Sequence, residues 1–210
     1  MVDNVNLTPE VDDVNHGYDG RVGTREALVE AATALLDEGG VAAVTLREVG
    51  RQVGVSHNAP YKHFASKELL LAAVAAAELE RRRDEIATTA ARKRSPEAIL
   101  RAVLHHYIAW ALERPARFRL VFGPWHVESE ELTKAAHAAQ TGLVDLVAAG
   151  QAVGALPPGD PVRLASLLRA TAHGAADLAA AGHLAAGGKG NASPEQLVDD
   201  LLAHLTGANR

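Results

Sequence analysis

The sequence contains no cysteine. This excludes a disulfide framework and a thiolate metal site, and it fits a reducing cytoplasm. Aromatic residues make up only 4% of the 210 residues, so we expect a core of close-packed helices rich in alanine. The longest purely apolar run, 69–77, is well short of the roughly 20 residues needed to span a bilayer. The N-terminus also lacks the basic start and apolar centre of a signal peptide, so we expect no membrane partner.

Basic residues are not in excess, because the net charge is −5, and this at first argues against nucleic-acid binding. The acidic excess lies in residues 1–20, which carry five Asp or Glu and no Lys or Arg. That segment alone accounts for −5, so the rest of the chain sums to zero. Electrostatics therefore permits DNA binding without requiring it. Residues 1–20 also lack periodicity, which is typical of a flexible arm.

Residues 45–70, TLREVGRQVGVSHNAPYKHFASKELL, have the pattern of a helix-turn-helix unit. Thr45 opens an S/T-x-x-E capping box, and Gly54 falls where a left-handed residue would end the first short helix. Ser56 is expected to cap the second helix. Pro60 lacks an amide proton and so predicts a short or tightened first turn there. In such units a short polar helix, held behind a packed partner, enters the major groove.

Helical signals also cover the rest of the chain. Thr24 is expected to cap a first helix that ends at Gly39-Gly40, and Ser66 a long helix to about residue 94. The charged run 81–85 on that long helix is interpreted as a solvated face in preference to a DNA contact. Further helices are predicted over roughly 95–112, 116–122, 128–153, 161–184 and from Ser193 onward. No strand alternation and no repeat occur, so we expect an all-α fold of about nine helices.

Residues 22–72 resemble the DNA-binding domain of TetR-type transcriptional regulators. The resemblance is carried by Thr45, Val55-Ser56, Tyr61-Lys62-His63-Phe64 and Lys67-Glu68-Leu69-Leu70. Residues 95–185 are similar to a C-terminal domain named for a Trp-His-Gly signature, through FRLVFG at 118–123 and through His173-Gly174 followed by AAGHL. Ala170 or Thr171 stands where the Trp of that signature is expected.

The resemblance implies three parts of the chain. These are a flexible acidic arm at 1–20, a three-helix DNA-binding domain at 21–67, and a helical-bundle domain for ligand binding and dimerisation at 68–210.

Within the helix-turn-helix, Asn58 is the best candidate for reading a base, because its amide can pair bidentately with adenine. His57 could donate to a base or a phosphate, or it could simply be a solvent-exposed residue. Ala59 could contact a thymine methyl group. Phosphate contacts are expected from Thr45, Arg47, Tyr61, Lys62, His63 and Lys67, and Ser56 completes this polar set.

The central helices concentrate aromatic and polar side chains in an otherwise aliphatic domain. An apolar cavity with a few polar groups is the usual form of a small-molecule site. The candidate ligand contacts are His106, Tyr107, Trp110, Phe118, Phe122, Trp125, Arg169 and His173, although any one of them could be core or surface. His173 is the strongest single candidate, because Gly174 could open space beside its ring.

These features predict a homodimer that reads a palindromic site through recognition helices about 34–36 Å apart. The last two helices are the expected dimer surface, with intramolecular core as the alternative role for their apolar residues. The expected function is a cytoplasmic, ligand-responsive regulator, most simply a repressor released from its operator by a small-molecule effector. The effector would act by moving the 66–94 helix.

Ten histidines suggest an alternative, a metal-binding sensor or enzyme. No H-x-x-x-H or H-E-x-x-H spacing occurs, and the adjacent His105 and His106 diverge by about 100° on a helix. No G-x-S-x-G element supports serine hydrolysis. We therefore expect no catalysis, no metal site and no cofactor. A scaffold with a decayed DNA-binding unit is a third possibility, against which the intact polar set at 56–67 argues.

Overall fold

The computed structural model describes residues 23–92 and 95–207, which form nine α-helices and one short 3-10 helix and include no strand. The all-α prediction is therefore confirmed for these residues, while the predicted arm at 1–20 lies outside them. In chain order the elements are α1 (Thr24–Ala43), α2 (Leu46–Val53), α3 (Ala59–His63), α4 (Lys67–Arg92), α5 (Pro96–Glu113), α6 (Pro115–Phe122), α7 (Glu130–Ala152), α8 (Pro161–Ala180), η1 (Lys189–Asn191) and α9 (Pro194–Gly207).

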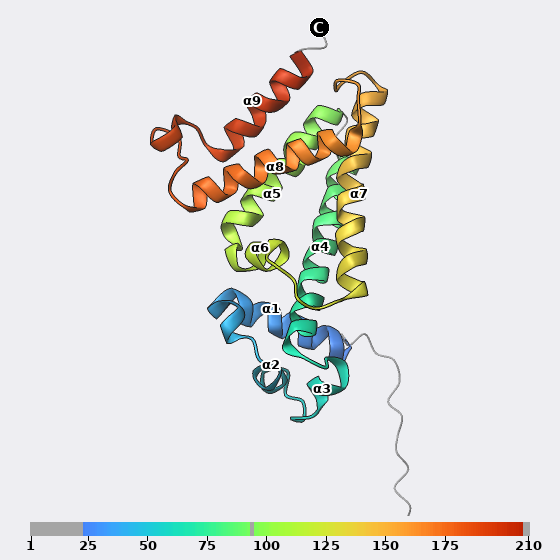
Figure 1. Cartoon of the computed structure of the whole chain (residues 1–210), viewed down its shortest axis with the longest axis vertical. Coiled ribbons are helices and arrows are strands. Elements are labelled where there is room, and N and C mark those ends of the chain that lie inside the picture. Colours follow the sequence, from blue (N-terminus) through green and yellow to red (C-terminus); the bar gives the residue numbers. More distant parts are fainter. Residues whose placement is uncertain (1–22, 93–94, 208–210) are drawn as a thin grey trace, which may run out of the picture.

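The helices form a small unit and a larger bundle joined by one long helix. Figure 1 shows α1, α2 and α3 gathered at one end of an elongated molecule, with α4 running from that end into the bundle. Inside the bundle α4 lies alongside α7, and α8 packs against α5, α7 and α9. None of the helices in the described ranges is both long and apolar enough to traverse a bilayer.

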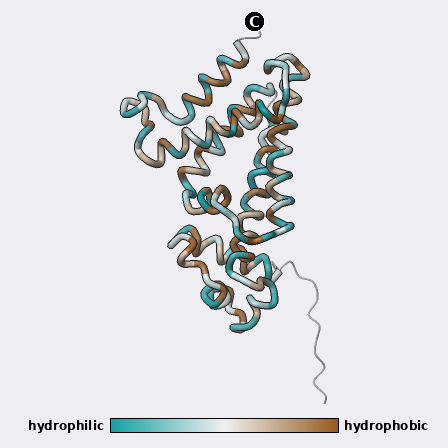
Figure 2. The backbone as a smooth tube through the Cα atoms, in the orientation of Figure 1, coloured by the Kyte–Doolittle hydropathy of each residue, from teal (hydrophilic) through white to brown (hydrophobic). Residues whose placement is uncertain are grey.

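Most buried hydrophobic side chains fall into two clusters, and Figure 2 shows apolar positions recurring along the long helices. The first cluster contains residues of α1, α2 and α4 together with the end of α5, three residues of α6 and one of α8, including Leu28, Leu36, Phe64, Leu70 and Phe118. The second lies within the bundle and includes Leu100, Ile108, Val147, Leu168 and Leu202. The core of the small unit is thus continuous with the bundle through α6.

The first helix of the helix-turn-helix begins and ends as predicted. The Thr45 hydroxyl accepts the amide of Glu48 at 3.1 Å, and Gly54 ends α2 in the left-handed region with φ of 74°. Only half of the expected capping box forms. The Glu48 carboxylate does not reach back to Thr45 but accepts from Arg51 at 2.6 Å.

Two predicted side-chain caps are wrong. α3 begins at Ala59 after Asn58, with no side-chain cap, and Ser56 accepts the Ala59 amide through its backbone carbonyl at 2.9 Å. α1 begins at Thr24 itself, after Gly23, again with no side-chain cap. A hydroxyl caps from the position just before the helix, which neither residue occupies.

Other predicted boundaries hold more closely. The hydroxyls of Ser66, Ser95 and Ser193 accept amides at 3.3, 3.1 and 3.2 Å at the starts of α4, α5 and α9. α1 kinks at Gly39 and Gly40, where the backbone leaves helical geometry, although one further turn follows. α8 ends at Ala180, four residues before its predicted end.

Pro60 packs directly on α2. A Cβ added at Gly50 would lie 2.7 Å from Cγ of Pro60, whose side chain is buried. α2 and α3 therefore approach so closely that only glycine fits at the contact. α3 itself has five residues, the short helix that the missing amide proton of Pro60 predicts.

We expect Gly50→Ala to lower the free energy of unfolding by about 1–3 kcal/mol, because the added methyl overpacks the contact with Pro60. Gly142→Ala on α7 is the matched control, since a Cβ there meets Ile86 at an ordinary 3.8 Å. This control should raise stability by about 0.5–1 kcal/mol through helix propensity. Urea unfolding of both variants measures whether each substitution lowers or raises the free energy of unfolding. An unchanged midpoint for Gly50→Ala would contradict the close packing between α2 and Pro60.

Candidate nucleic-acid interface and internal cavity

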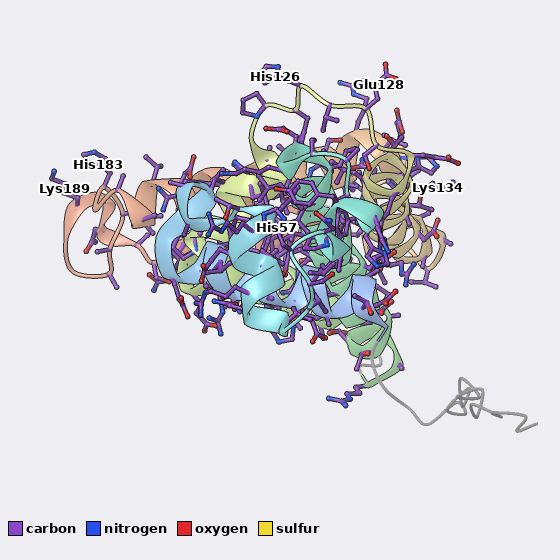
Figure 3. The ribbon with its side chains drawn as sticks, turned by 90° about the horizontal axis from the view of Figure 1, so that it is seen from below. His57, His126, Glu128, Lys134, His183 and Lys189 are labelled. Carbon is purple, nitrogen blue, oxygen red and sulfur yellow. The ribbon has the colours of Figure 1, made fainter. Side chains whose placement is uncertain are left out.

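The polar residues of the helix-turn-helix lie at the free end of the small unit. Figure 3 looks at this end from below and shows His57 near the centre of the view. Eight of the predicted DNA contacts are exposed and the other two, Ala59 and Lys67, are partly buried. The exposed ones are Thr45, Arg47, Ser56, His57, Asn58, Tyr61, Lys62 and His63.

The start of α3 presents a connected polar group. Nδ1 of His57 lies 3.3 Å from Oδ1 of Asn58, and the His57 and Tyr61 rings are 5.9 Å apart in a tilted arrangement. These side chains surround the first turn of α3, the part of a recognition helix that meets base edges. His57, Asn58 and Tyr61 therefore form one exposed polar group at the start of α3, and their contacts with bases stay a prediction.

The charges on this face are partly neutralised. The Arg51 guanidinium hydrogen-bonds to Glu48 and lowers the pKa of that carboxyl, so both groups remain ionised as a pair. Within the described ranges Arg47 and Lys62 form no such pair and supply cationic charge to the face. The ammonium of Lys67 donates to the carbonyl of Val41 at 2.6 Å. Because an ammonium has three donors, Lys67 can still contact a phosphate while holding that carbonyl.

A cavity of about 290 Å³ lies within the bundle. Its walls come from α4, α5, α6, α7 and α8 and from Trp125, which follows α6. Five predicted ligand contacts line it, namely Tyr107, Trp110, Phe122, Trp125 and Arg169. Most of the remaining lining is aliphatic: Leu79, Ile86, Val103, Leu104, Val121, Leu132, Ala136, Ala139 and Leu143.

Three predicted ligand contacts lie outside the cavity wall. The Tyr107 hydroxyl is 2.9 Å from Nδ1 of His173. The Phe118 ring is centred 4.7 Å from the His173 ring, so His173 and Phe118 lie together behind Tyr107. Burial raises the pKa of Tyr107 above its ordinary value, which keeps the hydroxyl protonated. His106 turns to another side, with Nδ1 3.2 Å from a carboxylate oxygen of Glu85.

Apart from its two chain neighbours, a Cβ added at Gly174 would meet nothing within 4 Å, so this position has open space around it. Its expected role beside the His173 ring stays a prediction.

Two polar wall residues, Arg82 and Gln140, were missed by the sequence reasoning. The sequence predicts a solvated face for Arg82 and its neighbours, but the Arg82 side chain is only 25% exposed. Its guanidinium lies 5.3 Å from the centre of the Trp110 ring. The helical spacing of Leu79, Arg82 and Ile86, at i, i+3 and i+7, is the signal that could have found it. Gln140 accepts a hydrogen bond from Arg169.

An ion-pair network leads from the cavity wall to the small unit. Glu78 on α4 is 1% exposed and accepts from Arg117 of α6 at 3.2 Å. Arg117 also donates to Asp37 of α1 at 2.6 Å, and that bond raises the pKa of the guanidinium. Nε of Arg82 lies 3.6 Å from Glu78. A continuous series of charged groups thus joins the cavity to α1.

The histidines form separate pairs. Nε2 of His105 lies 2.9 Å from Asp199, and Nδ1 of His204 lies 2.7 Å from the carbonyl of Asp200. In the part of the chain that the structure describes, no three His, Asp or Glu side chains are grouped so that they could hold a metal ion. The histidines of these described residues therefore do not come together in one metal site.

The surface and cavity together define a class of protein. A short polar helix is exposed at one end, and α4 connects it to a bundle that encloses an apolar cavity. This is the architecture of a helix-turn-helix transcriptional regulator with a separate helical-bundle domain.

Comparison with known families identifies which one. The family model described as "Bacterial regulatory proteins, tetR family" matches residues 28–74, and the one described as "Tetracyclin repressor-like, C-terminal domain" matches residues 100–205. The chain belongs to the TetR family of DNA-binding transcriptional regulators. The two family models match the expected DNA-binding domain and the expected C-terminal domain. The narrower assignment of the C-terminal domain to the group with a Trp-His-Gly signature stays a prediction.

Individual relatives agree with this assignment. The chain is 41% identical over 61 residues to the HTH-type transcriptional regulator BetI of Rhizobium meliloti (strain 1021), a match that covers 29% of this chain and 30% of BetI. A Rhodococcus sp. RHA1 protein of unknown function has a similar structure, with 30% identity, a TM-score of 0.76 and coverage of 93% of this chain and 99% of that one. A TetR-family regulator from Agrobacterium tumefaciens shares the fold at 21% identity and a TM-score of 0.65, over 87% and 97% of the two chains.

We expect Arg117→Met to lower the free energy of unfolding by about 3 kcal/mol, because it removes the cation between buried Glu78 and Asp37. Arg119→Met on the same helix is the control, since Arg119 is exposed and donates only to the carbonyl of Pro115. The control should change stability by no more than about 0.5 kcal/mol. Equal stabilities of the two variants in chemical unfolding would show that the network contributes nothing.

Proposed function

We propose that this chain is a homodimeric repressor that binds a palindromic operator through α3 and leaves it when a small-molecule effector occupies the cavity. Residues 21–67 form its DNA-binding part and residues 68–210 its effector and dimerisation part. It acts in the cytoplasm, without catalysis or a cofactor. The observation that carries this proposal is that α4 borders both sites. It begins beside α3, and its Leu79, Arg82 and Ile86 line the cavity.

The DNA contact is divided between two kinds of side chain. Asn58, with His57 beside it, reads base edges at the start of α3, because an amide supplies the paired donor and acceptor that adenine requires. Arg47, Tyr61 and Lys62 contact phosphates and set the register. α3 has only five residues and reads few base pairs, so specific binding needs a second copy.

The open face of α8 supports dimerisation. Leu167 and Leu178 are 48% and 47% exposed, and Gly174 between them has nothing within 4 Å of a Cβ position. The spacing of 167, 174 and 178 places these residues on one face of the helix. On α9 the inner side chains, Val198 and Leu202, belong to the subunit core, while Leu197, Leu201 and Leu205 of the same helix are partly buried. α8 therefore supplies most of the apolar surface offered to the second subunit.

The ion-pair network supports communication between the cavity and DNA. An occupant that moves Arg82 changes the charge balance at Glu78, and Arg117 joins Glu78 directly to Asp37 on α1. A second link, between Arg25 of α1 and Glu131 of α7 at 2.5 Å, would restrain the same movement. Release of DNA requires an effector that binds more tightly to the arrangement in which the two recognition helices no longer match the operator.

We expect Asn58→Ala to weaken operator binding by about 1–3 kcal/mol for each half-site and to relax preference at one adenine in each half-site, with little effect on non-specific DNA. Lys62→Gln should weaken binding to all sequences and reduce the slope of log K against log salt by about 1.8, because one phosphate contact is lost in each subunit of the dimer. Fluorescence anisotropy with labelled operator and scrambled DNA at several salt concentrations measures both effects.

Lys134→Gln is the charge control for this measurement. Lys134 lies on α7, away from the recognition surface, with a side chain 75% exposed (Figure 3). Its loss should leave the salt slope unchanged. An equal change of slope in the Lys62 and Lys134 variants, or a native protein that shows no sequence preference, would overturn the assignment of α3.

We expect Leu167→Glu to give a monomer in sedimentation experiments and to lose operator binding, because it places a charge in the apolar contact between the α8 helices. Val153→Glu is the matched control, since Val153 is 69% exposed at the end of α7, outside the proposed interface. A Leu167→Glu variant that sediments as a dimer would exclude this face of α8 as the interface.

A further inference from the structure

The cavity wall is rich in positive charge and hydrogen-bond donors. Two guanidinium groups, Arg82 and Arg169, contribute to it from α4 and α8, and among the described residues no Asp or Glu lines it. The other polar side chains that the described residues contribute to the wall are Gln140, Tyr107 and the two indoles. Tyr107 is already hydrogen-bonded to His173, and the oxygen of Gln140 already accepts from Arg169.

The two arginines differ in how their charge is balanced. Arg82 forms an ion pair with Glu85 at 2.7 Å and lies 3.6 Å from Glu78. Arg169 forms no ion pair with any carboxylate in the described ranges, and its partner is the neutral amide oxygen of Gln140. A partly buried cation without a counter-ion is costly, because the surrounding protein screens and solvates it less than water does.

Buried donors without acceptors occur in the same wall. Trp110 is 5% exposed, and its indole N–H has no hydrogen-bond partner in the described structure. Nε of Arg82, whose guanidinium lies over the Trp110 ring, also has none. An indole can only donate, and a buried donor left without an acceptor costs about 1–3 kcal/mol. Both nitrogens have almost no accessible surface, so the group in this wall that favours an anionic occupant is Arg169.

We propose that the effector is a small amphiphile with one carboxylate, which pairs with Arg169 while its apolar body lies among the aliphatic side chains of α4, α5 and α7. This inference rests on the proposed function of the cavity as the effector site. At about 290 Å³ the cavity is near the lower end of the size usual for ligand sites, so the body is short. A cationic ligand is disfavoured by the two guanidinium groups, and a neutral one leaves Arg169 without a counter-ion.

The chain carries its own reporter for this binding. Its two Trp residues, Trp110 and Trp125, both line the cavity, so intrinsic fluorescence follows occupancy without DNA. Octanoate, methyl octanoate and octylamine share an apolar chain and differ in charge. We expect a saturable change of fluorescence with octanoate at a concentration about tenfold lower than with the other two compounds. One charge-assisted hydrogen bond to the carboxylate accounts for an affinity difference of this size.

Variants at two arginines of α8 test the position of the anion. Arg169→Gln should weaken octanoate binding about tenfold and leave methyl octanoate within about twofold, while Arg169→Lys should retain the preference for octanoate. Arg163→Gln is the matched control, because Arg163 is exposed on the same helix and does not line the cavity. It should leave the affinities for all three compounds unchanged.

Three outcomes would overturn the proposal. They are octylamine or methyl octanoate binding as tightly as octanoate, a preference for octanoate that survives in Arg169→Gln, and the absence of a saturable change with any of the three compounds. The assay contains no DNA, so its failure is distinguishable from failure of the regulator proposal. Octanoate binding that leaves operator affinity unchanged would contradict effector-driven release and leave the carboxylate site standing.

Discussion

The buried carboxylate of Glu78 is the constraint on which the arrangement of the two parts depends. It sits near the middle of α4 with almost no solvent contact, so it must be matched by cations at that point. Arg81 and Arg82 come from its own helix, but Arg117 comes from α6 and brings Asp37 of α1 with it. Satisfying one carboxylate therefore fixes how α1 and α6 sit on α4. The cavity wall and the DNA-contacting unit are positioned by the same charges.

The helix-turn-helix could be predicted from the sequence because its determinants are local. The cap at Thr45, the left-handed Gly54 and the proline in α3 each act within a few residues, and all three are found as expected. The packing role of the Pro60 side chain could not be predicted from such local patterns. Its ring fills the space left by the absent side chain of Gly50, a contact between two helices that no local pattern reveals.

The cavity shows the same division between local and distant information. The scarcity of aromatic residues made their concentration in the central helices conspicuous, and five predicted residues do line the cavity. Arg82 was misassigned because a run of three arginines next to acidic residues has the composition of a solvated face. Its burial is decided by α5, which packs against that side of α4 and supplies Trp110.

The shared core of α1, α2, α4 and α6 makes the DNA-reading part less modular than its position at one end of the molecule suggests. Phe118 and Leu120 of α6 are buried in the same cluster as Leu28 and Leu36 of α1. A recombination event that joined the first 67 residues to the bundle of a distant relative would leave these apolar faces mismatched. Divergence of operator preference within such a lineage is therefore expected to proceed by point substitution at the exposed start of α3, where side chains can change without disturbing that core.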